Sequence, residues 1–374
     1  MYGCWSSGLV WPPCAYNDLD IAMSQQQHVA HGARVGVLDE LRLLAALAVV
    51  LFHFGFRGRT LGVTDMSLTA WEWLLKYGYL GVQMFFVISG FVIAYSAEGR
   101  TPLQFGIARF ARIYPMFVLC MTLTFLIVIG CGAPHLNATI FQWAANLIIK
   151  PELLGQQLMD GSYWSISYEI VFYGWVFVLM MLGRFKRETY PIIIPGWLLV
   201  SVIDRMFFGN VLMRHLFLTD ESGFFCAGLV LYAIFREGYS GRNVALLALS
   251  VVAAIYQSME LTQWNRVNYG TSYSDLVVSI SCLVIVAAIA LAIRRQRSLL
   301  PAGVMLAFGG ISYPLYLLHQ HIGYVIFNRV GSAASPEAVV TATVMLLICT
   351  SYLLWRFADE PSRRLTKSVL TRFI

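Results

Sequence analysis

The sequence places a few ionisable side chains inside long apolar segments, where a charge is costly unless it faces a polar interior. Arg42 and His53 lie eleven residues apart in one such segment, residues 37–56. At about 100° per residue the two would share one helix face, roughly 16 Å apart along the axis. His53 could then act as a general base or as an acyl acceptor, and Arg42 could hold an anion. The alternative is that His53 hydrogen-bonds a neighbouring helix and Arg42 reaches the lipid headgroups.

Two more arginines, Arg109 and Arg112, stand three residues apart just before the apolar segment 113–131. On a helix they would occupy adjacent positions of one face, where two planar guanidinium groups could clamp a phosphate. The alternative is an ordinary basic anchor at the cytoplasmic end of a membrane span. Since Arg42 is expected on the same side of the membrane, we expect the three arginines to share one anionic ligand.

Polar side chains also interrupt two later segments. Glu169 falls near the outer start of segment 164–183, with Tyr173 one turn further on. This carboxylate could steady the histidine or accept a hydroxyl proton, or it could merely hydrogen-bond near the interface. In segment 304–327, Pro314 would kink the helix. Tyr316 and His319, one turn apart there, could line a cavity, and hydrogen bonding between helices is the equal alternative.

Composition identifies the elements that must position these residues. Hydrophobic residues make up 58% of the 374 and charged residues only 12%, with a mean hydropathy of +0.67, whereas soluble domains average about 25% charged residues. We therefore predict an all-α polytopic membrane protein, a bundle of about ten transmembrane helices. The predicted spans are 37–56, 78–97, 113–131, 164–183, 191–208, 219–235, 243–260, 275–293, 304–327 and 338–357, and the short apolar stretch 140–149 suits an interfacial or re-entrant segment.

The charge distribution predicts the orientation. Most of the 26 lysines and arginines fall in segments on one side of the predicted bundle, so the positive-inside rule places both termini in the cytoplasm. Basic loops facing anionic headgroups account for the net charge of +6 without a nucleic-acid partner. The seven scattered cysteines have no ligand spacing, so we expect no disulfide framework and no metal site. The first 36 residues lack a signal peptide, and Met23 could be the true start, with 1–22 a start-site artefact.

Several short motifs occur in order along the chain and together resemble one family. They are Arg42-x10-His53, Gly81-Val82-x-x-Phe85-Phe86-x-x-Ser89-Gly90-Phe91, Arg109-x-x-Arg112-Ile113-Tyr114-Pro115, Trp164-Ser165-x-x-x-Glu169, Ser312-Tyr313-x-x-Tyr316-Leu317-x-His319 and Glu360-Pro361. Their order and spacing resemble the membrane-bound acyltransferase 3 family, whose members O-acylate bacterial surface polysaccharides and some small molecules. The resemblance runs from about Asp39 to Pro361.

This resemblance implies an acyl-CoA-dependent O-acyltransferase that moves an acetyl or other short acyl group to a hydroxyl of a surface polysaccharide or lipid-linked sugar. It implies that His53 is catalytic and that Arg42, Arg109 and Arg112 bind the acyl-CoA. We expect Glu169 to be a second catalytic residue that steadies the histidine or the acceptor from the outer side. Ser89, Tyr173, Tyr316 and His319 are expected to line the cavity. No permanently bound cofactor is expected, since acetyl-CoA or another acyl-CoA is the donor substrate.

The expected organisation is an N-terminal cytoplasmic extension over 1–36, an acyltransferase 3 transmembrane domain over 37–361 and a basic cytoplasmic tail over 362–374. The resemblance is to the stand-alone type without a soluble esterase-like domain, in the inner membrane of a bacterium. The expected partners are membrane lipid, the acyl-CoA and a saccharide acceptor. A transporter or flippase for a lipid-linked saccharide, or a noncatalytic partner in polysaccharide assembly, remains the alternative, and composition leaves the oligomeric state open.

Overall fold

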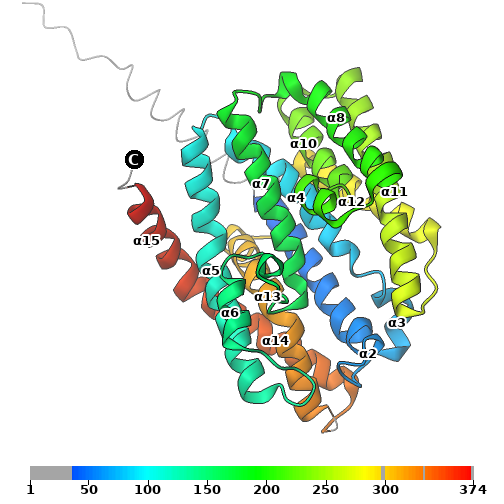
Figure 1. Ribbon diagram of the computed structural model, residues 1–374, viewed down its shortest axis with the longest axis vertical. Helices are drawn as coiled ribbons and strands as arrows, with labels where there is room; N and C mark the ends of the chain where they lie inside the picture. The colour runs from blue at the N-terminus through cyan, green and yellow to red at the C-terminus, as the bar shows by residue number, and fades with distance from the viewer. Residues whose placement is uncertain (1–35, 296–299, 332, 372–374) are drawn as a thin grey trace, which may run out of the picture.

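The computed structural model describes residues 36–295, 300–331 and 333–371, so the predicted extension before residue 36, with Cys4 and Cys14, lies outside the described residues. The described chain is 82% helical and contains no strand within those ranges. Figure 1 shows the helices packed side by side in one bundle. The chain is therefore an all-α polytopic membrane protein, as predicted.

Nine helices of the described chain are long and apolar enough to cross a membrane. They contain α4 (Leu80–Ala97), α5 (Pro102–Cys131), α7 (Trp164–Met181), α8 (Tyr190–Ile203), α10 (Ser222–Glu237), α11 (Gly241–Tyr269), α12 (Asp275–Arg295), α13 (Ala302–Val330) and α14 (Pro336–Leu354). The first predicted span is helical as well, because residues 36–52 form an α-helix that continues into the π-helical turn η1 (His53–Arg57) and α2 (Gly58–Thr60).

Shorter helices connect the long ones. They are η2 (Thr69–Trp71), α3 (Glu72–Leu75), α6 (Ile140–Asn146), η3 (Pro151–Leu154), η4 (Gly161–Tyr163), η5 (Arg187–Thr189), η6 (Asp204–Phe208), α9 (Val211–Phe217), η7 (Trp355–Asp359) and α15 (Glu360–Leu370). The stretch 140–149, predicted to lie at the interface or to re-enter, forms only the short α6 and does not span the bundle.

Helix α5 begins earlier than the predicted span 113–131. Thr101 and Gln104 form a reciprocal capping box, and Pro102 occupies the first turn, where its missing N–H costs nothing. Arg109 and Arg112 therefore lie within the helix and not in the loop before it. This early start fixes the direction of both guanidinium groups relative to the bundle.

The two most enclosed helices, α4 and α10, cross at glycines. A Cβ on Gly90 would lie 2.3 Å from the Phe225 carbonyl oxygen, and one on Gly228 would lie 2.2 Å from the Val87 carbonyl oxygen. Only glycine permits so close an approach, which is how small residues pack helices where lipid supplies no hydrophobic drive. This crossing holds α4, one wall of the site, against the bundle centre.

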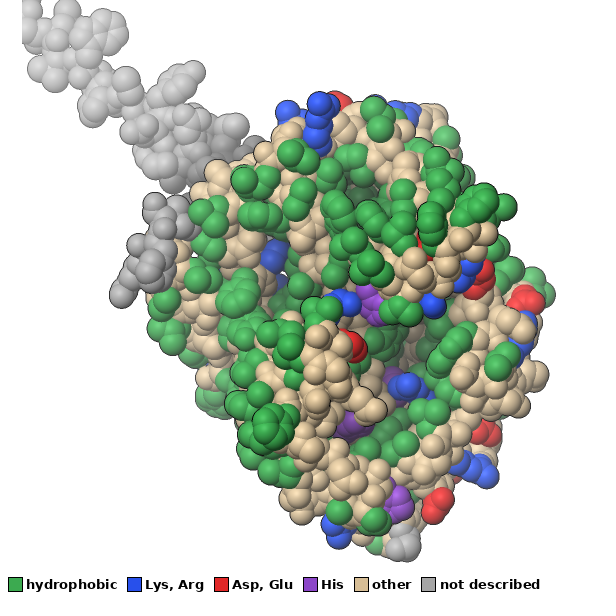
Figure 2. Space-filling view, in the orientation of Figure 1, with side chains coloured by type: hydrophobic (Ala, Val, Ile, Leu, Met, Phe, Trp, Pro, Cys, Tyr) green, Lys and Arg blue, Asp and Glu red, His purple; other side chains and the backbone are tan. Residues whose placement is uncertain are grey.

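The molecular surface fits a membrane environment. Figure 2 shows many hydrophobic side chains across one face, with lysine and arginine at its upper and lower ends and also near its middle. It also shows a hollow near the middle of this face, over the end of the helix formed by residues 36–52 and between α7 and α11, with basic and histidine side chains around it. Which end of the bundle faces the cytoplasm stays a prediction.

Candidate active site

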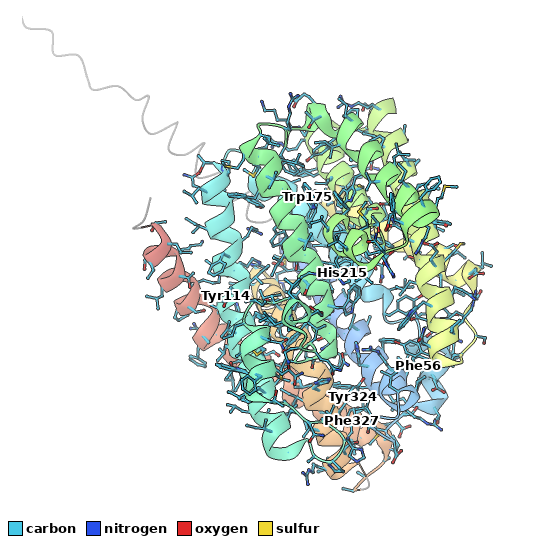
Figure 3. All side chains as sticks on the ribbon, viewed as in Figure 1. Phe56, Tyr114, Trp175, His215, Tyr324 and Phe327 are labelled. Atoms are coloured by element: carbon cyan, nitrogen blue, oxygen red, sulfur yellow. The ribbon has the colours of Figure 1, made fainter. Side chains whose placement is uncertain are left out.

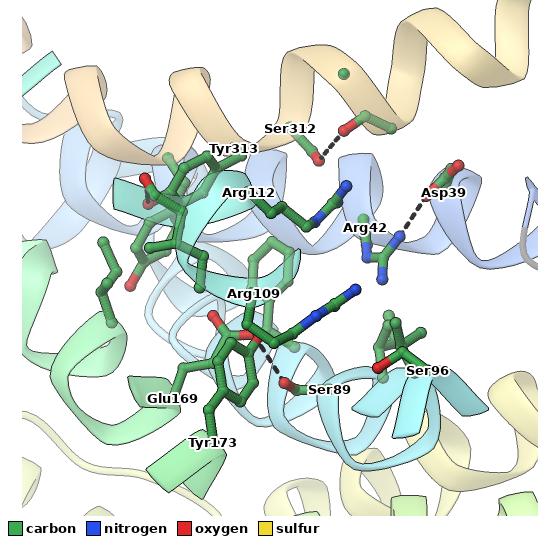
Figure 4. A pocket seen from close by; sticks show the side chains of 18 of the residues that line it. Asp39, Arg42, Ser89, Ser96, Arg109, Arg112, Glu169, Tyr173, Ser312 and Tyr313 are labelled. Carbon is green, nitrogen blue, oxygen red and sulfur yellow. Dashed lines mark hydrogen bonds and ion pairs between the residues drawn. The ribbon is translucent and has the colours of Figure 1, made fainter. Parts of the chain in front are cut away.

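A cavity of about 630 Å³ opens inside the bundle and brings most of the predicted site residues together. Its walls come from the helix of residues 36–52 and from α4, α5, α7, α13, η7 and α15. Seven predicted residues line it: Arg42, Arg109, Arg112, Ser89, Glu169, Tyr173 and Tyr316. Figure 4 shows the three guanidinium groups directed into the same space, as a shared ligand would need. His53, predicted on the same helix face as Arg42, does not line this cavity.

The charges on the cavity wall are unequally paired. Among the acidic residues that line it, Asp39 pairs with Arg42, Asp359 pairs with Arg363 at 3.3 Å, and Glu98 pairs with arginines outside the wall. The three remaining arginines of the wall form no ion pair with any residue that the structure describes: Arg100, Arg109 and Arg112. Unpaired guanidinium groups that converge on a cavity are suited to bind a polyanion.

Arg109 shows the imbalance most directly. Its side chain is half-buried, and its Nε has no hydrogen-bond partner within the described part of the chain. A buried donor without a partner costs free energy, of the order of 1–3 kcal/mol. An anionic ligand in the cavity would supply the acceptor that the protein leaves out.

Glu169 occupies a different position from the one expected beside His53. Its carboxylate accepts hydrogen bonds from Ser89 Oγ at 2.7 Å and from the hydroxyl of Tyr173 one turn along α7. Figure 4 shows these three side chains together in the cavity wall, on the same side as Arg109. The hydroxyl donors of α4 and α7 thus hold the carboxylate in the arginine-lined cavity and not beside His53, so the predicted support of the histidine is corrected. A role of Glu169 toward the acceptor stays a prediction.

His53 and His319 form a buried pair that does not line this cavity. His319 Nε2 lies 3.1 Å from His53 Nδ1, although the two residues are 266 positions apart in the chain. His53 opens the π-helical turn η1, a local widening of the helix that is frequent at functional sites. The sequence predicted both histidines as site residues but not that they contact each other.

Hydrogen-bond partners assign the protons of this pair. His319 Nδ1 lies 2.8 Å from the Tyr316 carbonyl oxygen, so it carries the proton and leaves a lone pair on Nε2. His53 Nδ1 faces that lone pair and, at 2.8 Å, the carbonyl oxygen of Val49, so it must donate. The lone pair of His53 is therefore on Nε2, where Arg57 Nη1 donates to it at 3.0 Å.

Two side chains at opposite ends of η4, the N-cap Asp160 and the last residue Tyr163, fix the part of α13 that carries His319. Asp160 is fully buried and accepts hydrogen bonds from Ser162 Oγ at 2.7 Å and from the backbone N–H of His321 at 2.8 Å. The Tyr163 hydroxyl donates to the carbonyl of Leu317 at 3.0 Å. Side chains that bond to backbone groups inside a helix locally open its ladder. Asp160 and Tyr163 thereby set where His319 stands.

Tyr316 separates the cavity from the histidine pair. Its hydroxyl lies 2.6 Å from Ser165 Oγ and donates to the Ser162 carbonyl at 3.1 Å, and its ring centroid is 5.6 Å from that of His319. Both Tyr316 and Ser165 line the cavity, whereas the histidines lie behind them. A ligand that binds the arginines therefore meets this hydroxyl pair before it meets His53.

Several residues of the site were not predicted as such. Arg57 follows the predicted span 37–56 and had no predicted role, Ser165 stood only within a motif, and Asp160 and Gln320 carried no prediction. One signal was readable: Asp160 two residues before Ser162 is a helix N-cap pattern, and Asp160 does accept from the Ser162 N–H at 2.9 Å. The others depend on contacts between distant helices, which no local pattern encodes.

Comparisons with known proteins find a family match and sequence relatives over most of the chain. A family profile described as an acyltransferase domain matches residues 36–356. The chain is 24% identical to acyltransferase MdmB of Streptomyces mycarofaciens, over 89% of this chain and 92% of that protein. It is 23% identical to O-acetyltransferase OatA of Staphylococcus aureus over 87% of this chain, which spans only 57% of that relative's length. No solved structure matches.

Proposed function

Since the chain belongs to the acyltransferase 3 family, and is thus a membrane O-acyltransferase, we propose that it moves an acetyl or other short acyl group from acyl-CoA to a hydroxyl of a surface polysaccharide or lipid-linked sugar. The donor enters from the cytoplasm and the acceptor from the other side of a bacterial inner membrane. The arginines of the cavity wall support the proposal that acyl-CoA is the donor, and the position of His53 supports the proposed transfer step.

The observation that carries the donor proposal is the group of arginines without carboxylate partners. Coenzyme A is a polyanion of phosphates joined to a neutral chain that ends in the thioester. Arg109 and Arg112 on α5 would hold the phosphates by charge-assisted hydrogen bonds, and Arg42, which is already paired with Asp39, would add a further N–H donor. The neutral chain would then run along the cavity toward Ser165 and Tyr316, which brings the thioester to the side of the histidine pair.

His53 Nε2 is the atom proposed to move the proton. In direct transfer Nε2 takes the proton of the acceptor hydroxyl while that oxygen bonds to the thioester carbonyl carbon. The carbon–sulfur bond then breaks, and the departing thiolate takes the proton back from the imidazolium. In the alternative two-step route Nε2 itself bonds to the carbonyl carbon, and the carbon–sulfur bond breaks to release the CoA thiolate. The acceptor oxygen then bonds to that carbon, the carbon–nitrogen bond to His53 breaks, and the hydroxyl proton passes through Nε2 to the thiolate. Both routes need the neutral tautomer that the hydrogen bonds favour.

Replacement of His53 tests the transfer step. The purified full chain in lipid nanodiscs would receive acetyl-CoA and a panel of methyl pyranosides, with free CoA thiol and O-acetylated product measured together. His53→Ala should lower product formation by about 10²–10⁴-fold, the usual contribution of a positioned general base. The control is His135→Ala, because His135 is exposed.

Two results would overturn this assignment. Full product formation by His53→Ala would show that another group performs the transfer. A wild-type chain that releases no CoA under any acceptor, while it moves a lipid-linked saccharide across the bilayer, would identify a carrier and not a transferase.

A further inference from the structure

Arg57 contacts three polar side chains on the side of His53 that is not part of the large cavity. Its Nη1 donates to His53 Nε2 at 3.0 Å and to Gln320 Oε1 at 3.4 Å, and its Nε donates to the Tyr269 hydroxyl at 3.0 Å. The π-helical turn places Arg57 four residues after His53 with its side chain folded back onto the ring. His53, Arg57, Gln320 and Tyr269 therefore form one hydrogen-bonded unit, with Arg57 at its centre.

Gln320 is held in place by packing against Gly161. A Cβ on Gly161 would lie 2.8 Å from the Gln320 amide nitrogen, so the amide packs directly on that glycine. Gln320 also follows His319 on the segment of α13 whose next N–H, that of His321, donates to Asp160. The residues that position His319 thus position the partner of Arg57 as well.

Aromatic side chains border this unit. The Tyr269 ring lies 5.7 Å from that of Phe56 and 5.9 Å from that of Trp264, which is 53% exposed. In Figure 3 Phe56, a residue of η1, lies beside the end of α11, the helix that supplies Tyr269. Tyr324 lies on α13, the helix that supplies Gln320. The hollow in Figure 2 lies over the end of helix 36–52 that leads into η1, the turn that carries His53 and Arg57.

We propose that this unit is the acceptor subsite, that its ligand is a pyranoside, and that Arg57 is the residue that anchors it. Arg57 is half-buried, and its Nη2 has no partner within the ranges that the structure describes. That group can therefore donate to a saccharide oxygen, while Tyr269 and Trp264 offer apolar ring faces of the kind that bind sugar rings. This inference rests on the proposed transferase function.

The arrangement also implies an exchange of hydrogen bonds. In this structure Arg57 Nη1 donates to the lone pair of His53 Nε2 that must receive the proton of the acceptor hydroxyl. The hydroxyl binds to His53 Nε2 only when Arg57 Nη1 leaves it. The displaced guanidinium then bonds to a second oxygen of the same sugar, so the site exchanges one charge-assisted hydrogen bond for another and no donor is left unpaired.

Protection of His53 from chemical modification tests the subsite without any turnover. Diethyl pyrocarbonate acylates the free lone pair of histidine, and the modified His53 peptide can be counted by mass spectrometry. Methyl pyranosides of glucose, galactose and glucuronic acid should slow this modification in the wild-type chain. In Arg57→Ala the unprotected rate should rise about tenfold, because the lone pair is exposed, and protection should need roughly tenfold more sugar.

The matched control is Arg59→Ala, which removes the same charge two residues away from an exposed side chain. Its modification rate and its protection should equal those of the wild type. Arg57→Lys, which keeps the charge but loses the planar fork, should show intermediate protection. The affinity for acetyl-CoA should be unchanged in all three variants.

Two outcomes would overturn the subsite. One is that none of the pyranosides protects His53 in the wild type, which excludes this ligand class. The other is that protection is the same in Arg57→Ala as in the wild type, which removes Arg57 as the anchor. Failure of the proposed function is a separate result: sugars would protect His53 through Arg57, yet the wild type would release no CoA.

Discussion

Single residues decide what the cavity can bind. Arg42 is neutralised by Asp39, so the cationic character of the wall comes from the arginines that lack such a partner. Arg109 and Arg112 are the two of these that the sequence pattern predicted. Because they are three residues apart on a capped helix, both guanidinium groups are held toward the cavity before any ligand arrives. Such preorganisation saves part of the entropic cost of binding.

Replacing these arginines should weaken the binding of the donor's phosphates and leave the binding of its neutral chain unchanged. Arg109→Gln and Arg112→Gln should each weaken acetyl-CoA binding by about tenfold, the loss of roughly 1.4 kcal/mol expected for a charge-assisted hydrogen bond. Acetyl-pantetheine, which has no phosphate, should bind both variants as well as it binds the wild type. Calorimetric titration of the two ligands measures the difference, with the exposed Arg184→Gln as the control. An equal loss for both ligands would contradict the phosphate assignment.

The residues of the site could be predicted from sequence only in part. The arginines could be found because a charge within or beside an apolar helix stands out locally and helical spacing fixes its face. The pairing of His53 with His319, and the donation from Arg57, could not be found in this way, since each depends on how two distant helices meet. Glu169 illustrates the same limit, because its hydroxyl partner Ser89 comes from another helix and draws it away from His53.

At the level of elements, α13 carries the contacts that connect the two parts of the site. Its Tyr316 hydroxyl bonds to Ser165 on α7, while its next turn presents His319 to His53 on the first helix. The spans themselves were predictable, because apolar length alone specifies a membrane helix. The early start of α5 could be read from the sequence as well, since Thr101, Pro102 and Gln104 form a standard helix N-terminal signal. The predicted span began later because its bounds were set by hydropathy alone.

Removal of the hydroxyl contact between α13 and α7 should allow the donor to be hydrolysed in the absence of an acceptor. Tyr316→Phe keeps the ring that packs near His319 but loses the bonds to Ser165 and to the Ser162 carbonyl. Water should then reach the thioester more easily, so hydrolysis of acetyl-CoA without any acceptor should rise several-fold. Measurement of thiol release against time gives this rate directly.

Tyr313→Phe provides the matched control for that experiment. Tyr313 lies on the same helix and lines the same cavity, but its hydroxyl donates to the Ile113 carbonyl at 3.2 Å and not to the wall between cavity and histidines. Its hydrolysis rate should stay at the wild-type level. Equal rates in both tyrosine variants and the wild type would show that the hydroxyl pair does not keep water from the thioester.

At the level of the whole molecule, residues from the beginning and the end of the described chain line one cavity. Asp39 and Arg42 from the start of the chain line the same cavity as Asp359 and Arg363 near its end. An even number of crossings between them accounts for this, as the ten predicted spans require. The proposed reaction adds a second requirement, because the donor is made in the cytoplasm, so the arginine-lined cavity must face that side.

Labelling of single cysteines in intact cells tests that orientation. In a chain whose native cysteines are replaced, a membrane-impermeant maleimide should label Arg59→Cys from outside but should reach Arg364→Cys only after the cells are permeabilised; both positions are exposed. Ser89→Cys should react only after permeabilisation, and acetyl-CoA should protect it, because Ser89 lines the donor cavity. The reverse pattern would place the arginines outside, where no acyl-CoA is available. The donor would then have to be a different anion, even if the fold and the histidine pair were unchanged.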